Sequence, residues 1–457
     1  MNRLIAISNR VSKLKEGGAQ GGLAVALSSA LRENNGIWFG WSGQSVDTFT
    51  GHLQMSENFG VRTATIDLEE QDVDEYYNGF ANQTLWPLFH YRIDLAEYER
   101  AYGEGYERVN NRFADAVMPL IDKSDVIWVH DYHLIPLGYR LRKLGCENRI
   151  GFFLHTPWPP TRLLVALPHH ERFVESLFAY DVVGFHTTEW LESFLHYCEK
   201  ELGAQVNDGK VTYDGKTITA IACPIGLDHK EFLAASQSDE AKGAFDRMRA
   251  SLQDRKLVVG VDRLDYSKGL EERLHGLERF FANHPERQRE TVMVQIAPPS
   301  RGDVASYQEI RAKLDEESGR INGAFSHVDW TPIRYVNRGY PRAELAGIYR
   351  AADAALVTPL RDGMNLVAKE YVVAQNPEDP GVLILSRFAG AAHQLKEALL
   401  INPYSREEIS DALVTALDMP LEERKRRWRA MMDVMEKTDV IWWREKFTSH
   451  LTQPDTA

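Results

Sequence analysis

The chain has 457 residues, and its 53 Lys and Arg against 66 Asp and Glu give a formal net charge of −13. Hydrophobic residues make up 44% and charged residues 26%, which is ordinary for a globular chain and excludes a disordered or collagen-like protein. No apolar run approaches the roughly 18 residues that span a bilayer, and the acidic balance argues against binding to nucleic acid or to an anionic membrane.

The first residues and the cysteines predict a cytoplasmic protein. The N-terminal apolar stretch covers only residues 4–7, which is too short for the core of a signal peptide. The three cysteines stand far apart and form no CxxC pair, so we expect neither a disulfide framework nor a cysteine-based zinc site. They are Cys146, Cys198 and Cys223.

Short apolar runs, many of them β-branched, predict strands that are buried on both faces of a parallel sheet. In chain order they cover residues 3–8, 125–130, 149–155, 181–186, 256–262, 291–297, 354–358 and 381–386. Helices are predicted at 22–32, 94–120, 169–179, 189–202, 271–283, 304–317 and 366–374. This alternation predicts an α/β protein with doubly wound sheets.

The predicted strands form two groups, which indicates two domains. The first group ends near Ile225, and the second begins at Lys256 after a charged, mostly helical segment. We place the boundary near residue 236, which gives domains at 1–236 and 237–439. A helix that begins near Pro420 is interrupted at 437–439, and the aromatic helix that follows would pack on either domain.

Polar side chains stand where several predicted strands end. They are Asn9 and Arg10, His130 and Asp131, His155, His186, and Asp262 and Arg263. Ligands of open α/β sheets bind beyond the carboxyl ends of the strands. Because the pattern recurs in both halves, we expect one active site in a cleft between two facing sheets.

Two segments suggest phosphate binding. Gly21 and Gly22 precede a predicted helix, where backbone amides approach a phosphate, although a tight turn is the more common explanation for such a pair. Arg263 and Lys268 follow a strand. The planar guanidinium of Arg263 and the ammonium group of Lys268 would both bind phosphate oxygens. The alternative for this second segment is a solvated turn with surface ion pairs.

A third segment places Asp362 before a predicted helix and Glu370 about two turns into it. The helix start would stabilise a diphosphate, and the carboxylates would bind sugar hydroxyls. Alternatively, Asp362 only caps the helix and Glu370 is a surface residue. The chain lacks GxGxxG and GxxxxGK[ST], which disfavours the usual dehydrogenase and P-loop nucleotide sites.

The segment His130-Asp131-Tyr132-His133 does not predict a metal centre. Neighbouring strand residues point to opposite faces, and no further ligand cluster lies nearby in sequence. We therefore expect no metal and no cofactor.

The chain resembles the trehalose-6-phosphate synthase family, glycosyltransferase family 20, over nearly its whole length. The resemblance rests on SNR at residues 8–10, GGLAVAL, WFGWSG, DEYYN, LWPLFHYR, HDYHL, RIGFFLHTPWP, RLDYSKG, QIAPPSRGDV, RINGAFS and TPLRDGMNLVAKEYV. Two departures are the short, Gly-rich loop from Arg10 to Gly21 and the pair Trp158 and Pro160.

The resemblance implies a GT-B fold of two Rossmann-like domains, with the active site in the cleft between them. It makes 1–236 the acceptor-binding domain, joined by the C-terminal helix 440–457, and 237–439 the nucleotide-sugar-binding domain. It also implies a retaining transfer of glucose from a nucleotide sugar, UDP-glucose as expected donor, to glucose 6-phosphate. The product is α,α-trehalose 6-phosphate, formed by front-face attack without a covalent intermediate. Family members form dimers or tetramers, so a homo-oligomer is expected.

The resemblance also assigns site residues. Those implied for the acceptor are Arg10, Trp41, Tyr77, Trp86, Asp131 and Arg301. Those implied for the donor are Gly22, His155, Arg263, Lys268, Asp362, Met364, Asn365, Leu366 and Glu370. The catalytic roles fall to Asp131, His155, Arg263 and Lys268.

Two alternatives remain open. A glucosylglycerol-phosphate synthase, which uses ADP-glucose and glycerol 3-phosphate, would share the donor motifs, but Tyr77, Trp86 and Arg301 together favour a hexose phosphate. A catalytically silent sugar-phosphate sensor would have lost donor-side residues, which are intact here.

Overall fold

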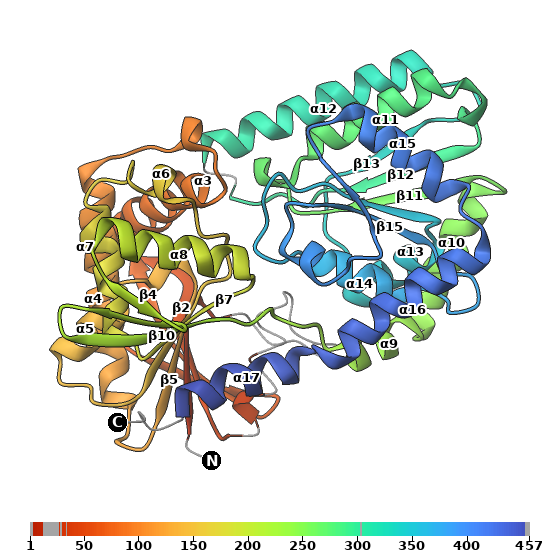
Figure 1. Cartoon of the computed structure of the whole chain (residues 1–457). Helices are drawn as coiled ribbons and strands as arrows, with labels where there is room; N and C mark the ends of the chain where they lie inside the picture. The colour runs from red at the N-terminus through yellow and green to blue at the C-terminus, as the bar shows by residue number, and fades with distance from the viewer. Residues whose placement is uncertain (1–2, 12–26, 28–29, 33, 302–303, 453–457) are drawn as a thin grey trace. The chain divides into compact units, whose positions relative to one another are not determined.

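The computed structural model describes residues 3–11, 27, 30–32, 34–301 and 304–452. Contacts divide the chain into a first unit, Met1–Ile225 with Val440–Ala457, and a second unit, Gly226–Asp439 (Figure 1). The division falls at Ile225, before the predicted boundary of 236, because α9 (His229–Ser236) packs on helices of the second unit. No described helix is long and apolar enough to cross a membrane.

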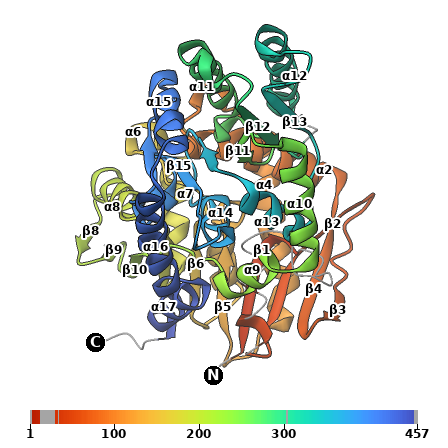
Figure 2. The same cartoon turned by 90° about the vertical axis from the view of Figure 1, so that its right-hand side faces the viewer.

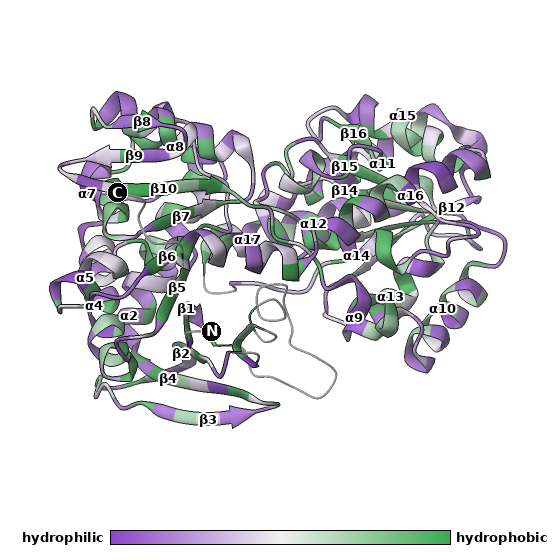
Figure 3. Ribbon diagram, turned by 60° about the horizontal axis from the view of Figure 1, so that its bottom comes forward, coloured by the Kyte–Doolittle hydropathy of each residue, from purple (hydrophilic) through white to green (hydrophobic). Residues whose placement is uncertain are grey.

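In the described part of the first unit, ten strands form one sheet in the order β3-β4-β2-β1-β5-β6-β7-β10-β9-β8. They are β1 (Leu4–Arg10), β2 (Ile37–Val46), β3 (Gln54–Asn58), β4 (Val61–Glu69), β5 (Val126–His130), β6 (Ile150–Phe153), β7 (Val182–Phe185), β8 (Gln205–Asn207), β9 (Lys210–Tyr213) and β10 (Lys216–Ala222). The strands from β4 to β10 run parallel, and antiparallel hairpins close both edges. Edge strand β3 is exposed and mostly hydrophilic, which discourages pairing with another chain (Figure 3).

The helical segments of the first unit are α2 (Glu70–Asp72), η1 (Val73–Leu85), α3 (Trp86–Phe89), η2 (Ile93–Leu95), α4 (Arg100–Val117), η3 (Met118–Leu120), η4 (Tyr132–Leu134), α5 (Leu137–Lys143), α6 (Thr161–Leu164), α7 (His170–Glu175), η5 (Ser176–Ala179), α8 (Thr188–Glu201) and α17 (Val440–Thr452). The predicted helix 94–120 begins only at Arg100, because the Glu97 amide donates to the Gln83 carbonyl (2.8 Å) instead of joining a helix. The sequence did not predict η1, which is a π-helix.

Helix α17 completes the core of the first unit, although it comes from the end of the chain (Figure 1). The Phe447 ring stacks on Trp128 of β5 with centroids 4.7 Å apart, and Trp443 lies edge-on to Phe153 of β6 at 5.1 Å. A Cβ on Gly151 would lie 2.7 Å from the Phe447 ring, so this glycine permits the close approach.

In the second unit, six parallel strands form a sheet in the order β13-β12-β11-β14-β15-β16. They are β11 (Lys256–Val261), β12 (Thr291–Ile296), β13 (Ile333–Val336), β14 (Ala354–Val357), β15 (Val382–Ser386) and β16 (Leu399–Ile401). The remaining helical segments are α10 (Asp239–Leu252), η6 (Tyr266–Lys268), α11 (Leu270–Asn283), η7 (Pro285–Arg287), α12 (Ala305–Phe325), α13 (Arg342–Ala351), α14 (Leu366–Ala374), η8 (Gly390–His393), α15 (Arg406–Leu417) and α16 (Leu421–Lys437).

Helices cover both faces of this second sheet. Helices α11, α12 and α15 pack together on one face, and α9, α10, α13, α14 and α16 on the other (Figure 2). The predicted doubly wound α/β architecture is therefore confirmed.

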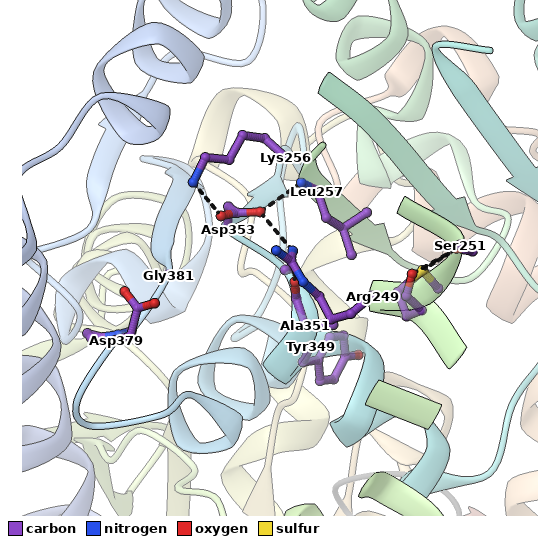
Figure 4. A network of polar contacts seen from close by, with 12 residues as sticks. Arg249, Ser251, Lys256, Leu257, Tyr349, Ala351, Asp353, Asp379 and Gly381 are labelled. Carbon is purple, nitrogen blue, oxygen red and sulfur yellow. Dashed lines mark hydrogen bonds and ion pairs between the residues drawn. The ribbon is translucent and has the colours of Figure 1, made fainter. Parts of the chain in front are cut away.

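The amino-terminal edge of the second sheet is held by the Asp353 carboxylate (Figure 4). It accepts hydrogen bonds from Lys256 Nζ and from the Leu257 amide, each at 2.9 Å. Arg249 of α10 approaches the same carboxylate at 3.4 Å. One side chain therefore joins α10, β11 and the start of β14, at the opposite end of the strands from the predicted site residues.

Candidate active site

Lys268 and Asp362 meet at the carboxyl edge of the second sheet. Lys268 Nζ donates to Asp362 Oδ2 at 2.6 Å, and only 11% and 13% of the two side chains is exposed. Asn365 Nδ2 donates to the same oxygen at 3.1 Å. Both ions are largely removed from water, so the attraction between them offsets part of the cost of burying each charge.

The first amides of α14 have no intrahelical acceptor, as expected for an anion site. Asn365 has a left-handed backbone (φ 76°), and its Oδ1 accepts from the Ala368 amide at 3.0 Å. Asn365 is therefore the cap, and the alternative in which Asp362 caps the helix is wrong. The amides of Met364, Asn365 and Leu366 precede or begin the helix, where no intrahelical acceptor exists.

Asp265 joins Arg263 to Arg301, and the sequence analysis did not identify it. Its fully buried Oδ2 lies 3.9 Å from Arg263 Nη2 and 3.6 Å from Arg301 Nη1. The Tyr307 hydroxyl donates to the same oxygen at 3.2 Å. The signal was a carboxylate between two cations in RLDYSKG, since such an acid commonly orients its basic neighbours.

Glu370 lies on α14 and is partly buried. Burial raises its pKa to about 7, and the nearby Arg342 opposes that shift. The alternative of an ordinary surface carboxylate does not describe this environment.

Asp131 and His155 come together at the carboxyl edge of the first sheet. Asp131 follows β5 with a left-handed backbone (φ 76°), a conformation that costs energy for a non-glycine residue. Its amide donates to the Phe153 carbonyl at 2.8 Å, and its Oδ1 accepts from the His155 amide at 3.1 Å. These two bonds hold the carboxylate beside the end of β6.

His155 is a neutral hydrogen-bonding group. Burial lowers its pKa to about 3, so the ring carries no charge at pH 7. His155 Nε2 lies 3.1 Å from Nδ1 of His130, whose pKa burial also lowers well below its usual value. His155 is therefore unsuited to act as a cationic acid near neutral pH.

Aromatic rings connect several of the predicted acceptor residues. The Arg10 guanidinium lies 5.6 Å from the centre of the Trp41 ring, and Trp41 meets Tyr77 edge-on at 5.5 Å. Tyr77 stacks on His133 with centroids 6.1 Å apart. Tyr77 belongs to η1, and π-helical turns often occur at functional sites.

Trp86 follows η1 directly at the start of α3 and is mostly buried. Its ring lies 5.6 Å from Tyr132, the residue after Asp131. Trp158, one of the two departures from the family pattern, is fully buried and packs edge-on against Phe194 at 5.2 Å.

The structure therefore gathers the predicted residues into two sets, one in each unit. The first unit holds Arg10, Trp41, Tyr77, Trp86, Asp131 and His155, and the second holds Arg263, Lys268, Arg301, Asp362, Met364, Asn365, Leu366 and Glu370. Gly22 lies outside the described residues. Within the described ranges, no group of three or more His, Cys, Asp or Glu side chains is arranged to hold a metal ion.

Two α/β units with cations and a helix start at a carboxyl edge are typical of GT-B glycosyltransferases. The chain belongs to glycosyltransferase family 20, whose sequence model it matches over residues 4–453. It is similar to the trehalose-6-phosphate synthase of Sinorhizobium fredii, with 48% identity over 99% of this chain and 98% of that one. A trehalose-6-phosphate synthase of Escherichia coli is 45% identical over 99% of this chain and 96% of its own length.

Solved structures agree with this assignment. A UDP-forming α,α-trehalose-phosphate synthase from Burkholderia xenovorans, in complex with glucose 6-phosphate, superposes with a TM-score of 0.96 and 48% identity, covering 99% of this chain and 100% of that one. The E. coli protein bound with UDP-2-fluoro glucose gives a TM-score of 0.95 at 44% identity, with 99% of both chains covered.

Proposed function

We propose that this enzyme transfers glucose from UDP-glucose to glucose 6-phosphate with retention, giving α,α-trehalose 6-phosphate and UDP. The observation that carries the proposal is the Lys268–Asp362–Asn365 cluster at the start of α14. Similar proteins, solved with glucose 6-phosphate and with UDP-2-fluoro glucose, support the choice of substrates.

The second unit would supply the charge for the leaving group. When the bond between the anomeric carbon and the diphosphate oxygen breaks, negative charge grows on the diphosphate. Arg263, Lys268 and the backbone amides at the start of α14 would stabilise this charge without a metal. Asp362 would accept a hydrogen bond from a hydroxyl of the donor glucose, and Glu370 would do so from the ribose.

The first unit would hold the acceptor. Arg10 is suited to the phosphate of glucose 6-phosphate, because guanidinium groups bind phosphate through paired hydrogen bonds. The family resemblance assigns Arg301 to the acceptor as well. Tyr77 and Trp86 would offer aromatic surface to the sugar. Asp131 would orient the acceptor hydroxyl. The neutral ring of His155 would form a hydrogen bond with the glucose of the nucleotide sugar.

The proposed chemistry has no covalent enzyme intermediate. The acceptor's anomeric hydroxyl forms the new bond on the face from which the diphosphate departs, and its proton passes to the leaving phosphate oxygen. The two carboxylates assigned to the sugars already accept hydrogen bonds, since Asp131 accepts from the His155 amide and Asp362 is paired with Lys268. Intact-protein mass spectrometry after incubation with UDP-2-fluoro glucose should show no glycosyl adduct, and an adduct on either residue would exclude front-face attack.

A product assay tests the whole proposal. Glucose 6-phosphate and glycerol 3-phosphate are each offered with UDP-, ADP- and GDP-glucose, and products are identified by mass spectrometry. We expect a disaccharide phosphate from glucose 6-phosphate and UDP-glucose. Product from glycerol 3-phosphate alone would reassign the acceptor, and binding of both substrates without any product would indicate a sensor.

Two further properties belong to this proposal. The described structure has Cys146, Cys198 and Cys223 as buried free thiols, which suits the reducing cytosol. The family resemblance implies a dimer or tetramer, which sedimentation of the purified protein measures.

A further inference from the structure

Arg273 is a fully buried arginine to which the proposed reaction gives no role. It belongs to α11, which covers one face of the second sheet (Figure 2). Its side chain is 0% exposed, and no other arginine within the described ranges is fully buried. A buried ion pair gives little net stability over apolar side chains of similar volume. Stability alone therefore does not explain why an arginine stands here.

The Arg273 guanidinium joins three parallel strands at their carboxyl ends. Nη2 donates to Asp262 Oδ2 at 2.6 Å, Nη1 to Gln295 Oε1 at 2.9 Å, and Nε to Thr358 Oγ1 at 3.0 Å. Asp262 and Thr358 directly follow β11 and β14, and Gln295 is the penultimate residue of β12. The planar fork thus fixes the relative positions of three strand ends at the edge that carries the candidate site.

Strand β11 makes room for this guanidinium. A Cβ on Gly260 would lie 2.6 Å from Arg273 Nη1 and 2.7 Å from Gln295 Oε1, which is closer than such atoms approach one another. A glycine inside a strand often marks the close approach of another group. Gly260 therefore permits the guanidinium to lie against the sheet.

Thr358 connects the guanidinium to the loop that carries Lys268. Its hydroxyl accepts from Arg273 Nε and donates to the Gly269 carbonyl at 2.9 Å. Gly269 directly follows Lys268 and has a left-handed backbone (φ 59°), and a Cβ there would collide with the Thr358 carbonyl oxygen. The two segments are therefore packed backbone against backbone, and the Thr358 hydroxyl holds them together.

Asp262 connects the same guanidinium to Arg263, the next residue in the chain. Burial raises the pKa of Asp262, and the charges of Arg273 and Lys268 oppose that shift. The Asp262 carboxylate is thus close enough to both cations to be stabilised by them. Arg273 therefore lies behind both of the side chains that the proposed function assigns to the diphosphate.

We propose that Arg273 and Thr358 are positioning residues for Lys268 and Arg263. Neither touches the substrate, and they act through the Gly269 carbonyl and the Asp262 carboxylate. This inference rests on the proposed function, in which Lys268 and Arg263 meet the charge that grows on the leaving diphosphate. A displacement of about 1 Å from the productive geometry costs on the order of 100-fold in rate, so loosening of this support should appear in kcat.

Thr358→Val removes the hydroxyl and keeps the shape of the side chain. We expect kcat to fall about tenfold or more, and the KM for glucose 6-phosphate to change by less than about twofold. Thr358→Ser keeps the hydroxyl and should retain most of kcat. Arg273→Lys keeps a charge beside Asp262 but loses the planar fork, and should lose at least as much kcat as Thr358→Val.

Thr291→Val is the matched control. Thr291 is 1% exposed and begins β12 at the opposite edge of the same sheet. This variant should keep the wild-type kcat. Thermal unfolding of each variant gives the folded fraction, and kcat is calculated per folded enzyme. A purely structural role of Thr358 would lower Tm and leave that kcat unchanged.

A double-mutant cycle with Lys268→Ala tests the route of the effect. If Thr358 acts through Lys268, Thr358→Val should lower kcat no further in the Lys268→Ala enzyme. Fully additive losses, an unchanged kcat in Thr358→Val, or an equal loss in Thr291→Val would each overturn the inference. Full kcat in Lys268→Ala alone would refute the role of Lys268 in the proposed function, and this inference with it.

Discussion

The ion pair of Lys268 and Asp362 has two consequences for the proposed reaction. A carboxylate 2.6 Å from the lysine fixes the position of the ammonium group, although on its own it would repel a diphosphate. The ammonium group compensates for that repulsion, and in the proposal Asp362 also accepts a hydrogen bond from a neutral sugar hydroxyl. In the proposed reaction Lys268 would act on charge that develops in the transition state, more than on binding of the ground state.

Lys268→Ala should lower kcat by about 100–1,000-fold, the usual effect of removing one group that stabilises transition-state charge. The KM for glucose 6-phosphate should change little, because the acceptor does not contact this residue in the proposal. Steady-state kinetics measure both quantities. Lys268→Arg, which keeps the charge, should recover part of kcat. A raised KM with unchanged kcat would contradict the assigned role.

Glu370 should make donor binding depend on pH. Its pKa of about 7 means that the carboxylate is protonated below neutrality, and a protonated carboxyl accepts ribose hydroxyls poorly. If only the ionised form binds, affinity for UDP-glucose falls about tenfold from pH 8 to pH 6. Isothermal titration measures this, and UDP-glucose is preferred to UDP because its diphosphate does not titrate in that range.

The neighbouring Lys369 would change donor binding with pH in the direction opposite to Glu370. Burial lowers its pKa to about 7, so it gains positive charge as the pH falls, which would strengthen the binding of an anion. Glu370→Gln removes the carboxylate and should abolish the weakening at low pH. If the variant still binds more weakly at pH 6 than at pH 8, Glu370 is not the titrating group.

At the scale of elements, periodicity predicted the buried strands well and the half-exposed ones poorly. All eight predicted strands are present, because continuous apolar runs are typical of strands buried on both faces. Strand β2 was missed because its second half, Ser42–Val46, is polar and partly exposed, and β3 because it is exposed throughout. The π-helix η1 has neither the α-helical nor the strand period.

The sequence likewise predicted only part of the candidate site. The motifs predicted which residues stand at strand ends, and the structure places most of them in two sets. The cap of α14 was less clear, because Asp362 and Asn365 are both good caps and only the backbone decides between them. Asp265 was missed because its role depends on burial between Arg263 and Arg301, which lie apart in the sequence.

Asp353→Ala should destabilise the second unit without affecting catalysis. It removes the acceptor of the buried Leu257 amide and of Lys256, so we expect a loss of about 2 kcal/mol. For a unit of this size that lowers Tm by about 4–8 °C. Calorimetry measures the shift, and activity at 25 °C should be retained.

Asp379→Ala is the matched control for this prediction. Asp379 forms a salt bridge with Arg424 at 2.7 Å, but 67% of its side chain is exposed. Loss of an exposed pair should cost less than about 1 kcal/mol. Equal shifts in the two variants would mean that Asp353 does not hold the edge of the sheet.

At the scale of the whole molecule, the two units differ in continuity. The second unit is one uninterrupted segment, Gly226–Asp439, so expressed alone it should unfold in a single cooperative transition. The segment 1–225 alone lacks α17 and should expose Trp128 and Phe153, which dye binding would report. Addition of the peptide 440–457 should suppress that binding, and a non-cooperative second unit would contradict the division.

The position of α17 at the far end of the chain also concerns how the protein is made. A ribosome synthesises the strands of the first unit first, yet Trp443 and Phe447, which cover Trp128 and Phe153, follow only after the entire second unit. At about 5–20 residues per second this interval lasts roughly 10–40 seconds. Throughout it the nascent chain carries an uncovered aromatic sheet face, so the half that is translated first finishes folding last and is the part in greatest need of a chaperone.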